Sequence, residues 1–267
     1  MNITVPNRFD LVVQKLTSIL VGRRLALVAT LLVVPMTTQA TYSIVATDSK
    51  TRQVGGSATS CIGSIPVSII YGSAPNHGAI HAQARFDFTS IYILKMVAHL
   101  LAKNTPAAVI GVITDPEVDP MYSERQYGVV EFGRAAGYTG TANNSYANDI
   151  QGTFETYAYS IQGNILTSQA VLDQAKAAFV SGGCDLADRL MLALEAGAQN
   201  GEGDQRCTPN GIPSDSAFIH VDAADKTVVL HLEVVGTAPT SPLLKLQTQY
   251  NAWRKDNPCP KSILNEN

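Results

Sequence analysis

The sequence is poor in charge and lacks the features of unfolded, fibrous or membrane-spanning chains. Only 15% of its 267 residues are charged and 45% are hydrophobic, so the chain is too apolar to stay disordered and long enough to bury a core. Its 20 glycines and 13 prolines are close to average usage, which excludes a collagen-like or low-complexity protein. No apolar run reaches the roughly 18 residues of a membrane span. A formal charge of −3 also lacks the basic excess expected for binding nucleic acid.

The first forty residues have the pattern of a secretory signal peptide. A pair of arginines precedes the apolar run 25–34, and residues 35–40 supply proline and small residues before a cleavage site. We predict cleavage between Ala40 and Thr41, which makes Thr41 the first residue of a periplasmic or secreted chain. A short membrane anchor or a buried helix is the alternative, but the short run and its polar end favour a signal peptide.

Removal of this leader changes the charge and the expected redox chemistry. The leader holds four of the 19 basic residues and one of the 22 acidic ones, so residues 41–267 have a formal charge of −6. All four cysteines lie in this part, at positions 61, 184, 207 and 259. An oxidising compartment allows two disulfides with three possible connectivities; buried free thiols are the alternative. No two cysteines are close in sequence and no histidine pair has a convincing ligand spacing, so we expect no metal and no cofactor.

Secondary-structure signals occur in blocks of strands and of helices. β-branched, aromatic and small residues predict strands at 41–47, 53–60, 67–71, 78–84, 127–132, 135–139, 156–165, 216–221 and 227–235. Helical spacing and caps predict helices at 89–103, from 105 onward, and at 168–180, 185–199 and 241–256. The Gly/Asn/Ser-rich stretch 140–151 is expected to be a loop. This order favours an α+β fold of two stacked antiparallel sheets covered by helices, formed by residues 41–267 as a single domain.

A threonine at the start of a strand, exposed by cleavage, can act as a nucleophile. Its own α-amine has a reference pKa near 8, so part of it is neutral at pH 7 and can take the proton of the threonine hydroxyl. Such a residue needs no separate histidine. The plain alternative is that any residue can follow a signal peptide.

Several sequence blocks together resemble one bacterial family. They are Thr41–Asp48, Ala82–Arg85, Arg125–Val130, Gly133–Gly140, Ser160–Asn164, Leu190–Gly197, Gly203–Arg206 and Ser216–Val221. In order and spacing they are similar to the family known as domain of unknown function 1028. The resemblance places the chain in the N-terminal nucleophile (Ntn) hydrolase superfamily and implies a four-layer αββα sandwich of antiparallel sheets that hydrolyses amide bonds. It implies a reaction type and leaves the substrate open, a small amide or peptide-like compound being expected.

Within that family resemblance, individual residues have candidate roles. The side-chain amide of Asn164 is expected to stabilise an oxyanion, or else it caps a loop. Asp204 is expected to orient the amine and Arg206 to bind a substrate carboxylate, unless the two form a surface ion pair. Gln83 is expected to bind substrate. Ser43 lies two residues after Thr41, on the same face of the strand, and is expected to help position the amine, or else it is a buried hydroxyl.

The family resemblance also implies a disulfide pairing. It brings the end of the second strand and the loop at Cys207 near Thr41, so a Cys61–Cys207 bridge is expected to brace the site, leaving Cys184 for Cys259. The loop Cys207–Gly211 departs from the family pattern, and so does the segment 64–72.

Two other classes of function stay open. One is a non-catalytic binding or surface-assembly protein of the same fold, in which the apolar C-terminal helix forms a homo-oligomer interface. The other is a serine or cysteine hydrolase, with Cys61 a possible nucleophile if it is unpaired, although no Gly-x-Ser-x-Gly elbow is present. His220 and His231 fall in the last predicted hairpin, where they can face each other.

Overall fold

The computed structural model describes residues 41–63, 65–236 and 241–260. The predicted signal peptide lies outside the described residues. No helix in the described ranges combines the length and the apolar character needed to cross a membrane.

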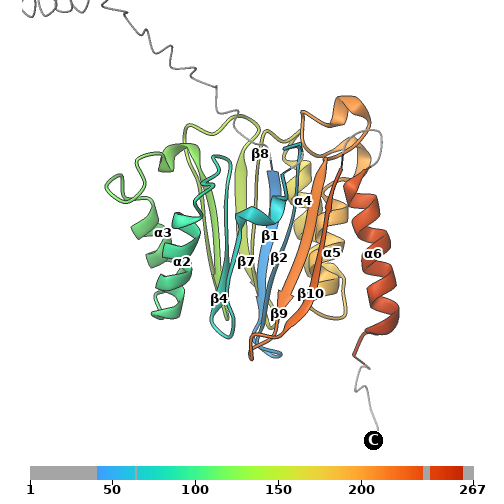
Figure 1. Ribbon diagram of the computed structural model, residues 1–267, viewed down its shortest axis with the longest axis horizontal. Coiled ribbons are helices and arrows are strands. Elements are labelled where there is room, and N and C mark those ends of the chain that lie inside the picture. The colour runs from blue at the N-terminus through green and yellow to red at the C-terminus, as the bar shows by residue number, and fades with distance from the viewer. Residues whose placement is uncertain (1–40, 64, 237–240, 261–267) are drawn as a thin grey trace, which may run out of the picture. The chain divides into compact units, whose positions relative to one another are not determined.

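Two antiparallel sheets form the centre of the fold (Figure 1). The six-stranded sheet has the order β10-β9-β2-β1-β8-β7 and the four-stranded sheet the order β3-β4-β5-β6. The strands are β1 (Thr41–Asp48), β2 (Gln53–Ser60), β3 (Tyr71–Ala74), β4 (Gly78–Gln83), β5 (Gln126–Glu131), β6 (Arg134–Thr139), β7 (Asn148–Phe154), β8 (Tyr157–Asn164), β9 (Ser216–Asp222) and β10 (Val228–Val235). Strand β1 contacts β4 and β5, and β8 contacts β5 and β6, so the sheets pack against each other.

Five α-helices accompany the sheets in the described residues. They are α2 (Ile91–Leu101), α3 (Pro106–Ile113), α4 (Ala170–Ser181), α5 (Leu186–Ala196) and α6 (Pro242–Asp256). Helices α2 and α3 contact the four-stranded sheet, whereas α4, α5 and α6 contact the six-stranded sheet, as Figure 1 shows. Thr105 caps α3 by accepting a hydrogen bond from the Ala108 amide, and Pro106 is its first residue, as the sequence predicts. The predicted α+β class is therefore confirmed at the level of two antiparallel sheets with helices.

The sequence-based assignment is wrong in two places. Residues 67–71, predicted as a strand, form a 3-10 turn over Val67–Ile70, and β3 begins only at Tyr71. Val67 and Ile70 both pack into a cluster with Phe218, a spacing that a short apolar run does not distinguish from a strand. The predicted loop 140–151 contains the start of β7, a partly exposed edge strand. It owes its conformation to pairing with β8 rather than to its own weak strand propensity.

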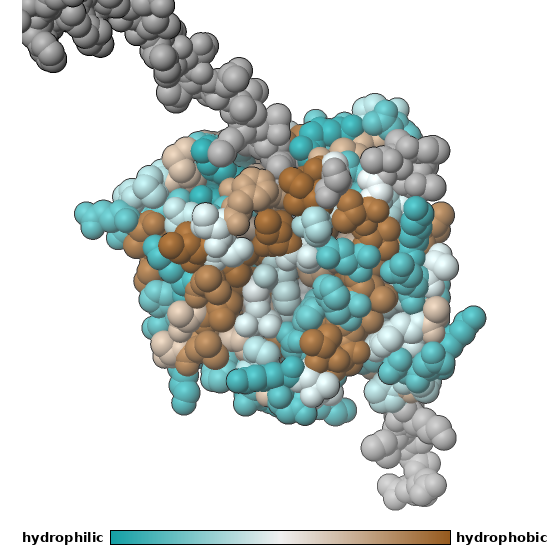
Figure 2. All heavy atoms as spheres, viewed as in Figure 1, coloured by the Kyte–Doolittle hydropathy of each residue, from teal (hydrophilic) through white to brown (hydrophobic). Residues whose placement is uncertain are grey.

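Exposed apolar side chains gather on α2 rather than on the C-terminal helix. Leu243, Leu246 and Tyr250 of α6 are buried in the core of the six-stranded sheet. By contrast Ile91 and Leu94 of α2 are exposed, and Figure 2 shows a group of hydrophobic residues over this part of the face. Most of the apolar side chains of α6 are thus used within the chain itself, with Leu244 left 62% exposed, and a homo-oligomer stays a prediction.

Candidate active site

Thr41 occupies the first position of β1, a central strand of the six-stranded sheet. It pairs with Ser60 at the end of β2 on one side and with Asn164 at the end of β8 on the other. Every residue of β1 is buried, because the strand has neighbours on both edges and layers on both faces. The end of β1 is therefore held on both sides by residues of the same sheet.

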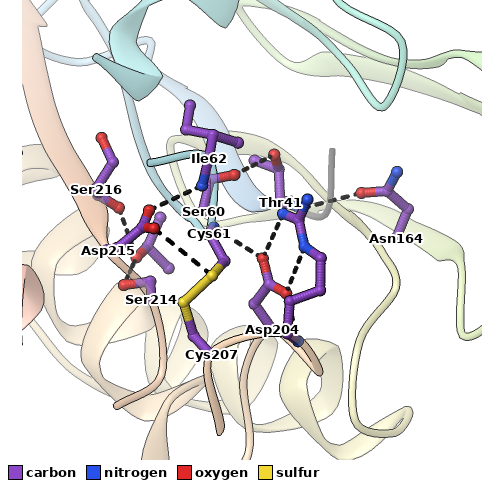
Figure 3. Close-up of polar contacts among 12 residues, drawn as sticks. Thr41, Ser60, Cys61, Ile62, Asn164, Asp204, Cys207, Ser214, Asp215 and Ser216 are labelled. Carbon is purple, nitrogen blue, oxygen red and sulfur yellow. Dashed lines mark hydrogen bonds and ion pairs between the residues drawn. A yellow bond between two sulfur atoms is a disulfide. The ribbon is translucent and has the colours of Figure 1, made fainter. Parts of the chain in front are cut away.

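Both polar groups of Thr41 make hydrogen bonds across these strand pairs (Figure 3). The backbone nitrogen donates to Oδ1 of Asn164 at 2.9 Å, and Oγ1 donates to Oγ of Ser60 at 3.0 Å. Thr41 itself has no exposed surface. In the full-length chain this nitrogen is a peptide nitrogen, so it becomes an amine only if the chain is cleaved before Thr41.

In the side-chain amide of Asn164, the oxygen accepts a hydrogen bond and the nitrogen has no partner among the described residues. Its Oδ1 accepts from Thr41, whereas its Nδ2 is buried and has no hydrogen-bond partner among the described residues. A buried amide donor without an acceptor is costly, and such groups call for an explanation. An oxygen atom of a bound ligand, placed next to Thr41, would satisfy it.

The backbone around Asn164 positions its side chain at the sheet end. Ile165, directly after it, has a φ of 50°, so the chain turns sharply out of β8. A Cβ on Gly163 would come within 2.6 Å of the Leu166 side chain, so the glycine permits that turn to pack tightly.

Gln83 and Ser43 form a buried network beneath Thr41. Nε2 of Gln83 donates to the carbonyl oxygen of Thr41 at 3.1 Å and to Oε1 of Gln126 at 3.0 Å. Oε1 of Gln83 accepts from Oγ of Ser43 at 2.6 Å, and that hydroxyl accepts from Nε2 of Gln162 at 2.6 Å. Both residues thus lie at the predicted site, where they hold the strand that carries Thr41.

Asp204 is buried in the loop after α5 and holds two neighbours. Its carboxylate accepts from the backbone nitrogen of Cys61 at 2.8 Å and from Nη2 of Arg206 at 2.9 Å. Burial raises the pKa of Asp204, against the lowering effect of the hydrogen bonds and charge of Arg206. Among the described residues the hydrogen-bond partners of its carboxylate are Cys61 and Arg206, and Cys61 directly follows Ser60, which contacts Thr41. Arg206 is more open, with 30% of its side chain exposed.

A disulfide and a second carboxylate fix the loop after β2. Cys61 is bonded to Cys207, and Asp215 accepts a hydrogen bond from the backbone nitrogen of Ile62 at 2.8 Å (Figure 3). Asp215 accepts a second hydrogen bond from the backbone nitrogen of Gly63 at 2.9 Å. Burial raises the pKa of Asp215, against the lowering effect of these backbone hydrogen bonds. The backbone nitrogens of Cys61, Ile62 and Gly63 therefore all donate to carboxylates, so they are not free to stabilise an oxyanion.

The disulfides agree with the pairing that the resemblance implies. The second bridge joins Cys184 to Cys259, far along the chain from the first. No described cysteine is free, so Cys61 cannot serve as a nucleophile while its disulfide is intact. The two clusters of metal-ligand type in the described residues each contain one of these disulfides, with Asp215 or Asp188 as the third member, and they do not fit a metal in the oxidised chain.

Two residues of the site were missed from sequence. Ser60 contacts the Thr41 hydroxyl, and Asp215 holds the adjoining loop. Ser60 could have been predicted from the sequence, because a hairpin that turns at residues 49–52 places residue 60 opposite residue 41. No local sequence signal marks Asp215.

Comparison with known proteins gives a family and a fold. The model of a family of unknown function (DUF1028) matches residues 41–244. The crystal structure of a DUF1028 protein from Silicibacter pomeroyi matches with a TM-score of 0.66 and 24% identity, covering 80% of this chain and 89% of that one. At that identity the likeness shows the fold alone. No curated protein matches the chain significantly.

Proposed function

The chain belongs to DUF1028, a family of unknown function, and we propose that it is an exported amide hydrolase whose nucleophile is Thr41. In this proposal residues 1–40 are a signal peptide, and residues 41–267 form a single Ntn-hydrolase-like domain. The two packed antiparallel sheets, with helices against each of them, support the four-layer αββα sandwich of that superfamily.

One observation carries the proposal. Asn164 accepts from the nitrogen of Thr41 with one amide atom, and its other amide atom is buried and unpartnered beside the same residue. A nucleophile, its base and a donor for the developing negative charge are the groups that acyl transfer requires. After cleavage before Thr41, all three lie at the paired ends of β1 and β8.

The chemistry follows from these positions. The neutral amine of Thr41 takes the proton of Oγ1, and Oγ1 forms a bond to the carbonyl carbon of the amide. Asn164 Nδ2 donates to the resulting oxyanion. The carbon–nitrogen bond then breaks, and the amine returns the proton to the leaving nitrogen. Water attacks the Thr41 ester in the same way and releases the acid.

Export is supported by the two disulfides. Such bonds persist in the periplasm and outside the cell, and they are rare in reducing compartments. The family match also begins at Thr41, directly after the predicted cleavage site. We expect the substrate to be a small amide or peptide-like compound, with Arg206 binding a carboxylate of it.

A second candidate function is non-catalytic binding with the same fold. The complete burial of Thr41 favours it, because a nucleophile must meet its substrate. Cleavage before Thr41 would leave a chain end at that position. A catalytic protein should then react with an acylating probe at Thr41, whereas a binding protein should not.

Covalent labelling tests the proposal without knowledge of the substrate. We expect the exported protein to have the intact mass of a chain that starts at Thr41. A β-lactone acylating probe should then add its mass to the peptide that contains Thr41. The label should be lost in Thr41→Ala and retained in Thr41→Ser. It should also be retained in the control Thr47→Ala: Thr47 lies at the other end of β1, where its hydroxyl donates to the carbonyl oxygen of Glu131. A chain that begins elsewhere, or equal labelling of Thr41→Ala, would refute the role of Thr41.

A further inference from the structure

Two histidines face each other on β9 and β10, the last two strands on one side of the six-stranded sheet. His220 of β9 and His231 of the edge strand β10 are directly paired in the sheet register. Their Nδ1 atoms lie 3.0 Å apart, and their rings are tilted by 66°. A pair at that separation shares one proton when neutral, because one nitrogen must donate and the other accept.

A carboxylate fixes the orientation of one of the two rings. Nε2 of His220 lies 2.8 Å from Oδ1 of Asp222, two residues further along β9 and on the same face. The side chain of Asp222 is only 6% exposed, so the carboxylate is firmly placed. With its Nε2 proton donated to Asp222, His220 presents the lone pair of Nδ1 toward His231. Outer-sphere carboxylates hold metal-binding histidines in this way.

We propose that His220 and His231 form a surface site for a divalent transition metal of the copper(II) or nickel(II) class. Imidazole nitrogens lie about 2.0–2.1 Å from such ions, so nitrogens 3.0 Å apart subtend about 94° at a shared metal. That angle suits two neighbouring positions of a square-planar or octahedral ion. A tetrahedral ion such as Zn²⁺ needs nitrogens about 3.4 Å apart.

The site is open and separate from the Thr41 site. His231 is exposed and the His220 side chain is 17% exposed, so an ion can enter and water can fill its remaining positions. Ser216, at the Thr41 end of β9, lies four residues before His220. None of the residues placed around Thr41 is needed to bind the ion.

Copper(II) titration of the purified chain, prepared without a histidine tag, tests this proposal. We expect one equivalent to bind with an electron paramagnetic resonance spectrum that shows two nitrogen ligands. Loss of an outer-sphere partner commonly weakens metal binding by about 10- to 100-fold, and we expect Asp222→Asn to weaken copper binding within that range. His220→Ala and His231→Ala should each weaken it by more. His99→Ala, on α2, is the matched control and should bind as the wild type does.

Two further measurements do not depend on the stability of the variants. Copper(II) should broaden the ring signals of His220 and His231 in the wild-type protein before those of His77 and His99. Bound cobalt(II) should give the weak visible absorption of a six-coordinate ion. Unchanged copper affinity in the double His220→Ala/His231→Ala variant, a single nitrogen ligand, or an intense tetrahedral cobalt band would overturn the proposal.

Discussion

The backbone nitrogen of Thr41 lies 2.9 Å from Oδ1 of Asn164, the residue paired with it on the neighbouring strand. The amide of Asn164 therefore faces Thr41 with its acceptor engaged and its Nδ2 donor free among the described residues. Because sheet pairing sets this relationship, neither residue can move along its strand without breaking the register. In the proposed mechanism, this one side chain would orient the amine of the cleaved chain and stabilise the oxyanion.

Replacement of Asn164 separates these two roles. Asn164→Asp keeps an acceptor for the amine and removes the donor, so we expect kcat to fall by about 10²–10³ with little change in KM. The measurement is steady-state hydrolysis of whichever amide a substrate panel identifies. Thr47→Ala is the control, since its hydroxyl bonds the chain far from Asn164. A change in KM alone, with kcat unchanged, would contradict an oxyanion role.

The two disulfides should differ in their effect on activity. Their loops span 146 and 75 residues, for which chain entropy predicts about 5 and 4.5 kcal/mol, and removal of native bridges commonly costs 2–5 kcal/mol. We expect both double variants, Cys61→Ser/Cys207→Ser and Cys184→Ser/Cys259→Ser, to lose stability of this order in urea unfolding. Only the first should also lower kcat, because Cys61 follows Ser60, which contacts the Thr41 hydroxyl. Equal activity of the two variants would show that the Cys61 loop does not position the site.

His81 should make the protein acid-sensitive. Its ring is fully buried between the sheets, against Tyr71 and Phe218, and burial lowers its pKa from 6.5 to about 3. Since the unfolded chain binds the proton more readily, protonation of His81 takes away no stability well above pH 6.5. As pH falls from 6.5 toward 3, the free energy of unfolding should decrease by up to about 1.4 kcal/mol per pH unit. Urea unfolding between pH 7.5 and 4 measures the slope.

A variant isolates the contribution of His81 from that of the carboxylates. The slope should flatten in His81→Gln and stay as in the wild type in His99→Gln. If the two variants had the same pH dependence, burial of His81 would not account for the acid sensitivity.

Sequence reasoning located some of the site residues that lie on regular strands. Thr41 was predicted from the expected cleavage site and the role of Asn164 from the family resemblance, and the strand pairing brings the two residues together. Ser43 was placed on the same face as Thr41 by simple alternation along β1. The face of Ser43 follows from local periodicity, whereas the pairing of Thr41 with Asn164 joins residues 123 positions apart and is not set by a short hairpin.

Contacts between distant loops could not be predicted in the same way. Asp204 approaches Cys61 across 143 residues and Asp215 approaches Gly63 across 152, and no periodicity relates them. Gln83 was expected to bind substrate, yet its side-chain amide makes hydrogen bonds with Ser43, Gln126 and the Thr41 carbonyl. These contacts arise only where the two sheets pack. Tertiary packing decides whether a polar side chain faces a ligand or its own chain.

Variants of Arg206 can distinguish a role in substrate binding from a role in stabilising the fold. Its guanidinium pairs with the carboxylate of Asp204, which is only 1% exposed, so Arg206→Gln leaves a buried carboxylate without its counterion. Because Arg206 itself is partly exposed, we expect a loss of about 1–3 kcal/mol in urea unfolding. KM should rise for amide substrates that carry a carboxylate and stay constant for neutral analogues, because the cation is lost.

The double variant Arg206→Gln/Asp204→Asn distinguishes the two effects. Removing both charges takes away the unpaired carboxylate, so stability should return close to that of the wild type. KM for the carboxylate-bearing substrate should stay high, because no cation remains to bind it. If the double variant recovered KM together with stability, Arg206 would act only as the counterion of Asp204, and the substrate carboxylate would have to bind elsewhere.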